Sequence, residues 1–324
     1  MTIPIPPPGY TARSATFDDI SAVAALVNLC MEADGDIPDS TPEELRQEWQ
    51  GGDLQEESIL VSDPAGKIVA FADLLPNRNL QTSVYGYVHP RRLSQGLGSF
   101  LVNWGESYAR RHMAQAPPQA RVIVRHYIRE INQHGRRLLQ SMGYEPVRVH
   151  YWMTVTLKNA PPSPQWPEGI AVRAYVPGQD EQALYEAGEA SFQDIWNRQP
   201  STLERWTAAT RDPDFDPSLW FLAQDQATGA VAAICLCSAI PGQGMVTQLG
   251  VLRPWRRRGL GLSLLQHAFG AFYRRGIVEI GLSVDAESAT GAPRLYARAG
   301  MTVARSYIQY LKELRPGERL PYNS

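Results

Sequence analysis

The sequence contains few cysteines and few histidines, and this scarcity argues against stabilising disulfides and metal sites. Only 3 cysteines and 6 histidines occur among 324 residues. Three cysteines cannot form a disulfide framework for a chain of this size. Cys235 and Cys237 are two residues apart in a strand-like run, which places both side chains on one face, but no paired ligands flank them as a zinc site would require. We interpret both as small core side chains and expect no metal.

Long apolar runs and a surplus of charge are also absent. No segment approaches the run of about 18 apolar residues that spans a bilayer. The N-terminal stretch MTIPIPPPGY lacks the basic start and apolar core of a signal peptide. We therefore expect a cytoplasmic protein without a membrane partner. Lys and Arg number 31 against 33 Asp and Glu, so the chain is nearly neutral and nucleic acid is not an expected partner.

Prolines divide the chain into two halves. A length of 324 residues exceeds what one hydrophobic core usually supports. The segment NAPPSPQWPE at 159–168 holds four prolines, which oppose both helix and central strand, so it is predicted to be a linker. We expect an N-terminal domain at 1–158 and a C-terminal domain at 169–324.

The two halves resemble each other in sequence. GYVHPRRLSQGLGSFLVNWGESYARR at 86–111 parallels LGVLRPWRRRGLGLSLLQHAFGAFYRR at 249–275. A repeat of about half the chain predicts two copies of one fold. Within each copy a strand, a loop, a helix and another strand follow one another. This order predicts an α/β fold with a mixed sheet.

The loop after the strand of the second copy combines arginines with glycines. A glycine-rich turn that ends a strand and opens a helix directs free backbone N–H groups at one point, where the helix dipole attracts anions. Neighbouring arginines add charge-assisted hydrogen bonds. A Walker A loop would need lysine where Leu262 stands, and a dinucleotide loop would need glycine where Leu264 stands. The sequence thus predicts a phosphate cradle that is neither of these nucleotide motifs, and its residues are Arg256, Arg257, Arg258, Gly259, Leu260, Gly261 and Leu262.

This loop resembles the acetyl-CoA pyrophosphate loop of the GCN5-related N-acetyltransferases, through Val251, Arg256, Gly259 and Gly261 at the family's spacing. The stretch RLYARAGM at 294–301 is similar to the second CoA motif of that family. The resemblance implies an enzyme that transfers an acetyl group from acetyl-CoA to a primary amine by direct attack on the thioester.

The resemblance also implies roles for single residues. The strand at 246–251 would be splayed from its neighbour, so that the main chain of Leu249 and Val251 binds the pantetheine arm. The N–H of Leu249 would polarise the thioester carbonyl. Tyr296 would protonate the departing thiolate, although a core tyrosine remains the alternative. Ser288 or Ala289 stands near the position of the family's CoA-binding asparagine, depending on where one extra residue is placed.

The general base and the acceptor are left open by the sequence. Asp194, Asp285 and Glu287 are candidate bases, and each is equally consistent with a helix cap or a solvated charge. Trp196 lies where the family builds its acceptor pocket, but core packing fits it as well. The acceptor amine belongs to a small molecule or to a protein or peptide, and the chain is a monomer or a homodimer.

The first copy retains a weaker version of the cradle. Leu93 stands at the position of Arg256, and Leu139 at that of Tyr296, so this copy lacks both a loop arginine and a proton donor. We expect it to be degenerate and the second copy to be catalytic, an arrangement similar to that of mycothiol synthase and its relatives. A non-enzymatic acyl-CoA sensor or scaffold is the alternative. If the first copy binds CoA, the implied contacts are Val88, Gln95, Gly96, Leu97, Gly98, Ser99 and Asn132.

Overall fold

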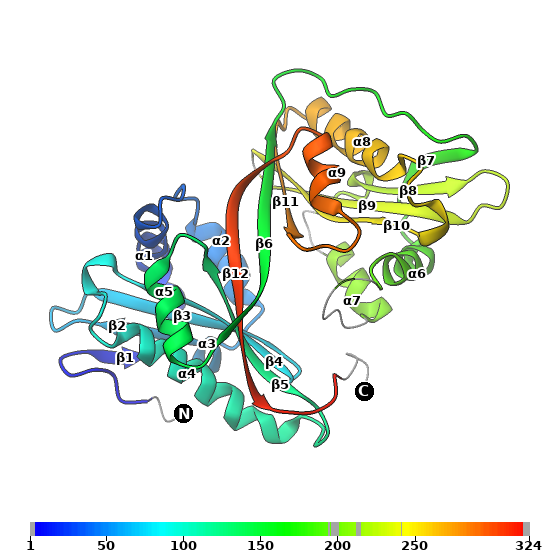
Figure 1. Ribbon diagram of the computed structural model, residues 1–324. Coiled ribbons are helices and arrows are strands. Elements are labelled where there is room, and N and C mark those ends of the chain that lie inside the picture. Colours follow the sequence, from blue (N-terminus) through cyan, green and yellow to red (C-terminus); the bar gives the residue numbers. More distant parts are fainter. Residues whose placement is uncertain (1–3, 194, 196–200, 212–214, 241, 320–324) are drawn as a thin grey trace. The chain divides into compact units, whose positions relative to one another are not determined.

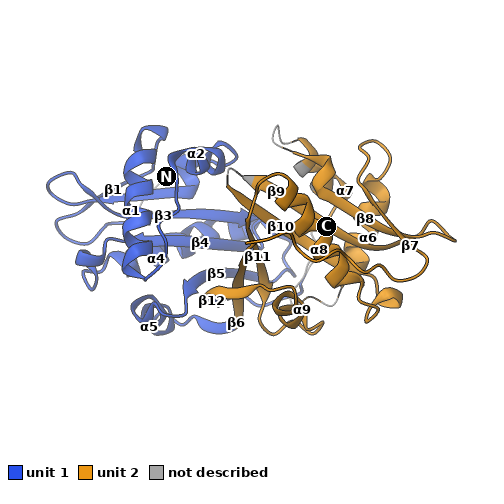
Figure 2. Ribbon diagram, turned by 90° about the horizontal axis from the view of Figure 1, so that it is seen from above, with its two compact units in different colours: residues 1–147, 307–319 blue, residues 148–306, 320–324 orange. Residues whose placement is uncertain are grey.

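The computed structural model describes residues 4–193, 195, 201–211, 215–240 and 242–319. The chain forms two compact units, which Figure 2 shows in different colours. Unit 1 comprises residues 1–147 with 307–319, and unit 2 comprises residues 148–306 with 320–324. Among the described residues, no helix combines the length and the apolar composition that crossing a bilayer requires.

Unit 1 is a mixed sheet with helices on both faces (Figure 1). Its strand order is β1-β2-β3-β4-β5-β12, and only β4 and β5 pair in parallel. The strands are β1 (Thr11–Arg13), β2 (Ser58–Ser62), β3 (Ile68–Asn77), β4 (Gln81–Val88), β5 (Val122–Arg129) and the C-terminal part of β12 (Thr302–Arg315). The helices are α1 (Ile20–Ala33), α2 (Pro42–Gln50), α3 (Leu54–Glu57), α4 (Leu97–His112) and α5 (Gln133–Ser141).

Alternation along β4 assigns the two faces of this sheet. A Cβ added to Gly86 would meet Leu101 of α4 at 3.6 Å, so the even-numbered side chains of β4 face α4. Tyr87 packs against the opposite cluster, in which α1 and α2 bury Trp49 and Phe71. The odd-numbered side chains therefore face α1 and α2.

Unit 2 repeats this architecture with the order β6-β11-β10-β9-β8-β7. One face buries Cys235 and Cys237 against α8, and the other buries Ile234 against α6 and α7. The two cysteines are thus core side chains, as predicted. The strands are β6 (Glu145–Thr156), β7 (Ile170–Ala174), β8 (Trp220–Asp225), β9 (Val231–Ile240), β10 (Gln243–Val251) and β11 (Glu279–Asp285), and the helices are α6 (Glu181–Ser191), α7 (Leu203–Ala208), α8 (Leu260–Arg274) and α9 (Ala292–Arg298).

The compact units differ from the predicted ranges 1–158 and 169–324 by an exchange of strands. Residues 150–156 of β6, from the first half of the sequence, pair with β11 of unit 2. Residues 307–315 of β12, from the second half, pair with β5 of unit 1. The alternating pattern of such segments predicts a strand with one buried face, but it does not specify which sheet edge the strand joins. Each half therefore completes the sheet of the other unit.

An arginine–aspartate pair repeats in both units and confirms that they are copies. The guanidinium of Arg13 donates to both oxygens of Asp19 at 2.7 and 2.6 Å. Arg173 makes the same fork with Asp180 at 2.5 and 2.7 Å. The arginine hydrogen bond lowers the pKa of Asp19 to about 2 and also lowers that of Asp180. The pair fixes the turn between the first strand and first helix of each unit.

Candidate active site

Strand β10 leaves its neighbour β11 after three residues. The two strands pair only from Gln243 to Met245, whereas β10 pairs with β9 along its whole length. The N–H of Leu252 donates to the carbonyl of Ala232 in β9 at 3.0 Å. Because hydrogen-bonding directions alternate along a strand, the N–H groups of Leu249 and Val251 point to the edge that β11 has left open. The splay implied by the family resemblance is therefore present in unit 2.

A β-bulge lies within the same stretch of β10. The register with β9 shifts between Val246 and Gln248, which leaves Thr247 as the extra residue. The Thr247 hydroxyl donates to the carbonyl of Leu236 at 3.0 Å. Bulges bend a strand and increase its twist, so this one redirects the open edge near Leu249.

The arginine–glycine loop opens α8 without a capping side chain. Arg257 and Gly259 adopt left-handed backbone conformations with φ of 62° and 83°. Gly259 is the N-cap residue and has no side chain to cover the first turn. The N–H groups of Leu260, Gly261 and Leu262 are therefore directed past the helix N-terminus, which is the geometry that binds a phosphate. Arg257 and Arg258 are exposed beside this position, and the guanidinium of Arg258 lies 4.8 Å from the centre of the Trp255 ring.

Arg256 performs a different task from the other two loop arginines. Its Nε donates to the carbonyl of Val251 and its Nη2 to the carbonyl of Ser191, both at 3.0 Å. These bonds tie the loop to the end of the splayed strand and to the C-terminus of α6. The carbonyl of Val251 thus already accepts a hydrogen bond, while the N–H groups of Val251 and Leu249 remain directed to the open edge. No motif in the sequence identifies Ser191 as a partner of Arg256.

Tyr296 lies in α9 and packs into the core of unit 2 with 8% of its surface exposed. Burial, and then the neighbouring Cys235 thiol, raise the pKa of its phenol, so the hydroxyl stays protonated near neutral pH. Cys235 is the register partner of Leu249. The tyrosine therefore lies on the side of the sheet that carries the Leu249 side chain. Its hydroxyl makes no hydrogen bond to any other described residue, which leaves a proton donor available.

Gly261 allows α8, α9 and β10 to approach one another closely. A Cβ at this position would lie 3.1 Å from the side chain of Leu295 and 3.5 Å from that of Val251. Leu295 directly precedes Tyr296. Because Gly261 has no side chain, α9, which carries Tyr296, can lie close to the splayed strand β10.

The candidate bases are engaged in other contacts. Asp285 accepts a hydrogen bond from the N–H of Glu287 at 2.8 Å, and Glu287 forms an ion pair with Arg148. Ser288 exchanges a hydrogen bond with Thr290 at 2.9 Å and lies before the start of α9, so it does not cap that helix. Asp194 and Trp196 lie outside the described residues. The described part of the chain thus assigns no general base.

Unit 1 repeats the loop and the splay. Ser94 and Gly96 have φ of 60° and 81°, matching Arg257 and Gly259, and α4 begins at Leu97. Strand β4 pairs with β5 only from Gln81 to Ser83, so the main chain of Val88 also lies beyond the paired segment. Gln95, Gly98 and Ser99 are at the expected places around the helix start.

Several features of unit 1 differ from those of unit 2. Leu139 is buried at 1% exposure and Leu93 lies on the surface. The Tyr10 hydroxyl donates to Gln95, and Pro7 lies 3.4 Å from where a Cβ of Gly96 would be, whereas nothing lies within 4 Å of that point at Gly259. The N-terminal segment thus contacts this cradle, a feature that sequence reasoning missed.

Asn132 of unit 1 has both ends of its amide occupied. It accepts from the N–H of Gly135 at 2.8 Å, which caps α5, and donates to Asp34 at 2.9 Å. It therefore ties α5 to the end of α1. The family asparagine predicted at this position has a structural role here.

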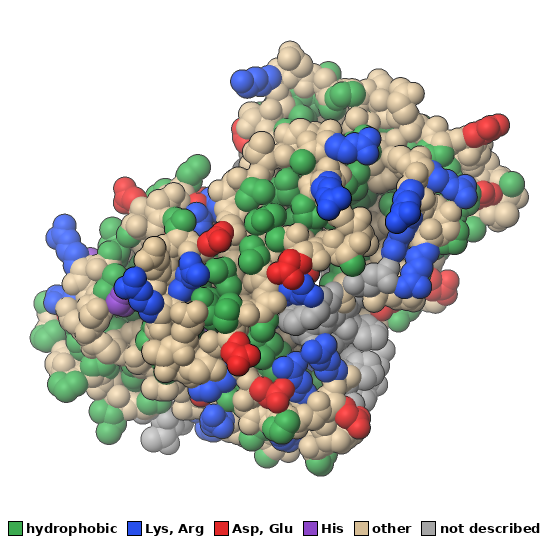
Figure 3. Space-filling view, viewed as in Figure 1, with side chains coloured by type: hydrophobic (Ala, Val, Ile, Leu, Met, Phe, Trp, Pro, Cys, Tyr) green, Lys and Arg blue, Asp and Glu red, His purple; other side chains and the backbone are tan. Residues whose placement is uncertain are grey.

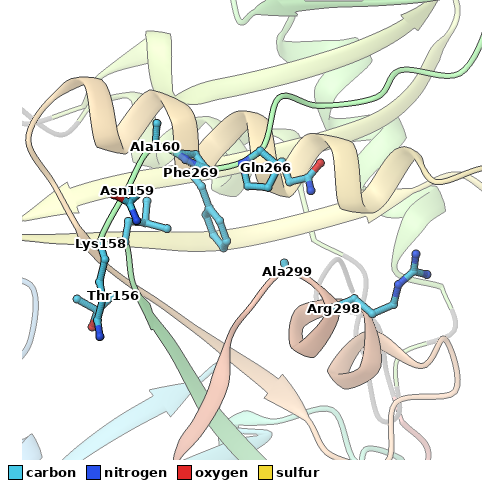
Figure 4. Close-up of a pocket in the computed structure, with 11 residues that line it drawn as sticks. Thr156, Lys158, Asn159, Ala160, Gln266, Phe269, Arg298 and Ala299 are labelled. Carbon is cyan, nitrogen blue, oxygen red and sulfur yellow. The ribbon is translucent and has the colours of Figure 1, made fainter.

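A cavity of about 330 Å³ lies in unit 2 between the end of β6, the proline-rich linker, α8 and α9. Figure 4 shows the ring of Phe269 pointing from α8 into it, with Lys158 and Arg298 at its borders. Gln266 and Phe269 belong to the middle of α8, so this cavity is separate from the cradle at the helix start. On the face visible in Figure 3, basic and acidic side chains are mixed over much of the surface, and several Lys and Arg side chains gather at the right of the view.

Comparisons with known proteins agree with this geometry. The model of the Acetyltransferase (GNAT) family matches residues 181–301. A crystal structure of a GCN5-related N-acetyltransferase from Sphaerobacter thermophilus is 48% identical, covers 98% of this chain and 99% of that chain, and superposes with a TM-score of 0.92. A tandem GNAT protein from the clavulanic acid biosynthesis pathway is 16% identical with a TM-score of 0.72, covers 95% of this chain and 100% of that chain, and shares the fold.

Curated relatives extend the similarity over most of the chain. A mycothiol acetyltransferase of Thermobispora bispora is 28% identical over 88% of this chain and 92% of its own length. One of Kineococcus radiotolerans is 29% identical over 94% of this chain and 97% of its own length. With the two splayed sheets and their glycine loops, these similarities show that the chain belongs to the GCN5-related N-acetyltransferase (GNAT) family and is an acetyltransferase of the tandem type.

Proposed function

We propose that unit 2 transfers the acetyl group of acetyl-CoA to the primary amine of a small molecule. The observation that carries this proposal is the convergence, within unit 2 alone, of an uncapped helix start, an open strand edge and a protonated tyrosine. In unit 1 the tyrosine position is a buried leucine. The name of the curated relatives, mycothiol acetyltransferase, supports a small-molecule acceptor.

The chain's own described groups account for donor binding, stabilisation of the oxyanion and protonation of the leaving thiolate. The N–H groups of Leu260, Gly261 and Leu262 bind the pyrophosphate of acetyl-CoA, and the open edge of β10 receives the pantetheine arm. The N–H of Leu249 stabilises the oxyanion that forms when the amine nitrogen attacks the thioester carbon. The C–S bond then breaks, and the thiolate takes its proton from Tyr296. The amine releases its own proton to water or to a base outside the described residues.

Thiol release from acetyl-CoA in the presence of a panel of small amines tests this proposal on the full chain. We expect Tyr296→Phe to lower turnover by roughly 100-fold while acetyl-CoA binding is preserved, because a positioned acid typically contributes that much. Tyr273→Phe, a half-buried tyrosine in the last turn of α8, is the matched control and should keep its rate.

Two outcomes would count against the assignment. A normal rate for Tyr296→Phe would show that Tyr296 packs in the core and does not act as the proton donor. If acetyl-CoA binds and no amine in the panel releases thiol, the sensor or scaffold alternative is favoured instead.

A further inference from the structure

Residues 7–10 of unit 1 form a tight turn that directly precedes the first strand of its sheet. The N–H of Tyr10 donates to the carbonyl of Pro7 at 3.1 Å, and Gly9 has φ of 84°. Pro8 at the second position and a left-handed glycine at the third are the residues typical of a type II turn. Strand β1 follows at once and pairs with β2. The turn therefore has little conformational freedom and is anchored to the sheet at one end.

Two side chains of this turn lie against the loop that opens α4. The Tyr10 hydroxyl donates to the side-chain oxygen of Gln95. The Pro7 ring lies 3.4 Å from the point where a Cβ of Gly96 would be, and Gly96 is the N-cap residue of α4. The ring thus lies beside the helix start, where a pyrophosphate would approach the backbone N–H groups.

Unit 2 contains the same turn at residues 167–170. In each unit the turn begins six residues before the arginine of the repeated arginine–aspartate pair. The carbonyl of Pro167 accepts a hydrogen bond from the N–H of Ile170 at 3.2 Å, and Gly169 has φ of 75°. The turn therefore belongs to the shared fold, and its presence alone does not account for the contact in unit 1.

The residues of the turn and of the segment before it pack differently in the two units. Ile170 stands at the position of Tyr10 and is buried in the core of unit 2, without a polar group that could reach the loop. Among the described residues, nothing lies within 4 Å of the Cβ point at Gly259. The segment before the turn instead packs along α8, where the rings of Trp166 and His267 are 5.7 Å apart. Contact between the turn and the helix start is thus specific to unit 1.

We propose that residues 7–10 hold the cradle of unit 1 closed to acetyl-CoA, an inference that rests on the proposed role of the same cradle in unit 2. The turn and a pyrophosphate compete for the space in front of α4, so unit 1 binds the donor only when the turn moves aside. Unit 2 is therefore loaded at acetyl-CoA concentrations that leave unit 1 empty. Because Leu139 stands at the position of Tyr296, the closed turn keeps acetyl-CoA out of the copy that lacks the proton donor.

Titration calorimetry of the full chain with coenzyme A counts the occupied cradles. We expect one equivalent for the wild-type chain. Pro7→Gly together with Tyr10→Phe removes both the ring contact and the hydrogen bond, and should raise the affinity for a second equivalent at least 10-fold. Pro167→Gly makes the matching change in the turn of unit 2, and as the control it should not add a second equivalent.

Amide hydrogen exchange locates the second equivalent. In the double variant, coenzyme A should slow the exchange of residues 97–99, whereas in the wild-type chain these amides should not respond. Thermal melts establish that each variant is folded. Tyr10→Phe alone keeps the aromatic ring and should give a smaller gain in affinity, so it tests the proposal even if the double variant does not fold.

Three results would overturn the proposal. The wild-type chain could already bind two equivalents and protect residues 97–99, neither Tyr10 variant could gain affinity there, or Pro167→Gly could add a second equivalent as the double variant does. Protection of residues 260–262 reports on unit 2 in the same experiment. Failure of the proposal for unit 2 would remove that protection and the first equivalent, and is therefore distinguishable from failure at unit 1.

Discussion

Replacing Arg256 by leucine should destabilise unit 2 even when no ligand is bound. Leu93 occupies the equivalent position of unit 1, where the loop keeps the same backbone conformation, so a leucine fits this turn. The substitution removes the hydrogen bonds to the carbonyls of Val251 and Ser191. Hydrogen bonds from a charged donor contribute about 1.5–3 kcal/mol each. Because the guanidinium is half-buried, we take the lower end for each of the two bonds and expect a loss of about 3 kcal/mol in total.

Denaturant unfolding of the ligand-free chain measures this loss. Arg258→Leu is the control, since it removes the same charge from the same loop but, among the described residues, breaks only the contact with the Trp255 ring, which contributes about 0.5–1 kcal/mol. Affinity for acetyl-CoA should also fall by about 10-fold in Arg256→Leu, because the loop is no longer held against the strand.

The outcome separates two roles for Arg256. If ligand-free stability is unchanged while acetyl-CoA affinity falls and its dependence on salt becomes weaker, the guanidinium acts on the phosphates directly and the positioning role is refuted. Equal losses of stability in Arg256→Leu and Arg258→Leu would likewise show that the two carbonyl bonds contribute little.

Three further predictions concern stability, boundaries and the two loops. Burial raises the pKa of Asp73 to about 7, so this residue lowers the stability of the wild-type chain by about 4 kcal/mol in total as the pH rises from about 4 to about 7. Asp73→Asn should therefore be more stable than the wild-type chain in urea at pH 8, and the difference should vanish at pH 4. A fragment of residues 148–306 retains every strand of unit 2 and should give a cooperative melt, whereas residues 169–324 lack β6 and should aggregate on size-exclusion chromatography; a monomeric, cooperatively melting 169–324 fragment would contradict the strand exchange. Gly261→Val should abolish thiol release, because the added side chain pushes Leu295 and α9 away. Gly98→Val brings a side chain against Leu138 of α5 and should retain most activity, provided that thermal melts show it folded. The opposite pattern would place catalysis in unit 1.

The glycine loops of this chain could be identified from the sequence because they depend on local backbone geometry. A left-handed turn at the start of a helix requires glycine, and the sequence shows one at Gly96 and at Gly259. The splay of β10 followed from the family resemblance, and the repeat predicted a second copy of the same sheet. The buried Tyr296 agrees with the family position as well, and its catalytic role stays a prediction.

Other features could not be predicted, because they depend on partners distant in sequence. The bonds of Arg256 to Val251 and Ser191 require knowing where α6 ends in space. The exchange of β6 and β12 cannot be predicted from the sequence, because an alternating strand fits any sheet edge of suitable register. Asp73 lacks a sequence signal altogether, since only the fold shows that its position belongs to an apolar face.

The exchanged strands also have a consequence for the order in which the protein is made. The sheet of unit 1 is completed by residues 307–315, which the ribosome adds after every other described strand of both units. Until they emerge, β5 presents an unpaired edge while the other described strands of both units have already been made. Domains of many proteins fold one after another during synthesis, but this unit cannot do so with its own half of the sequence. We therefore expect the nascent chain to depend on chaperones until residues 307–315 have been made, and a stop codon just before residue 307 to damage unit 1 first.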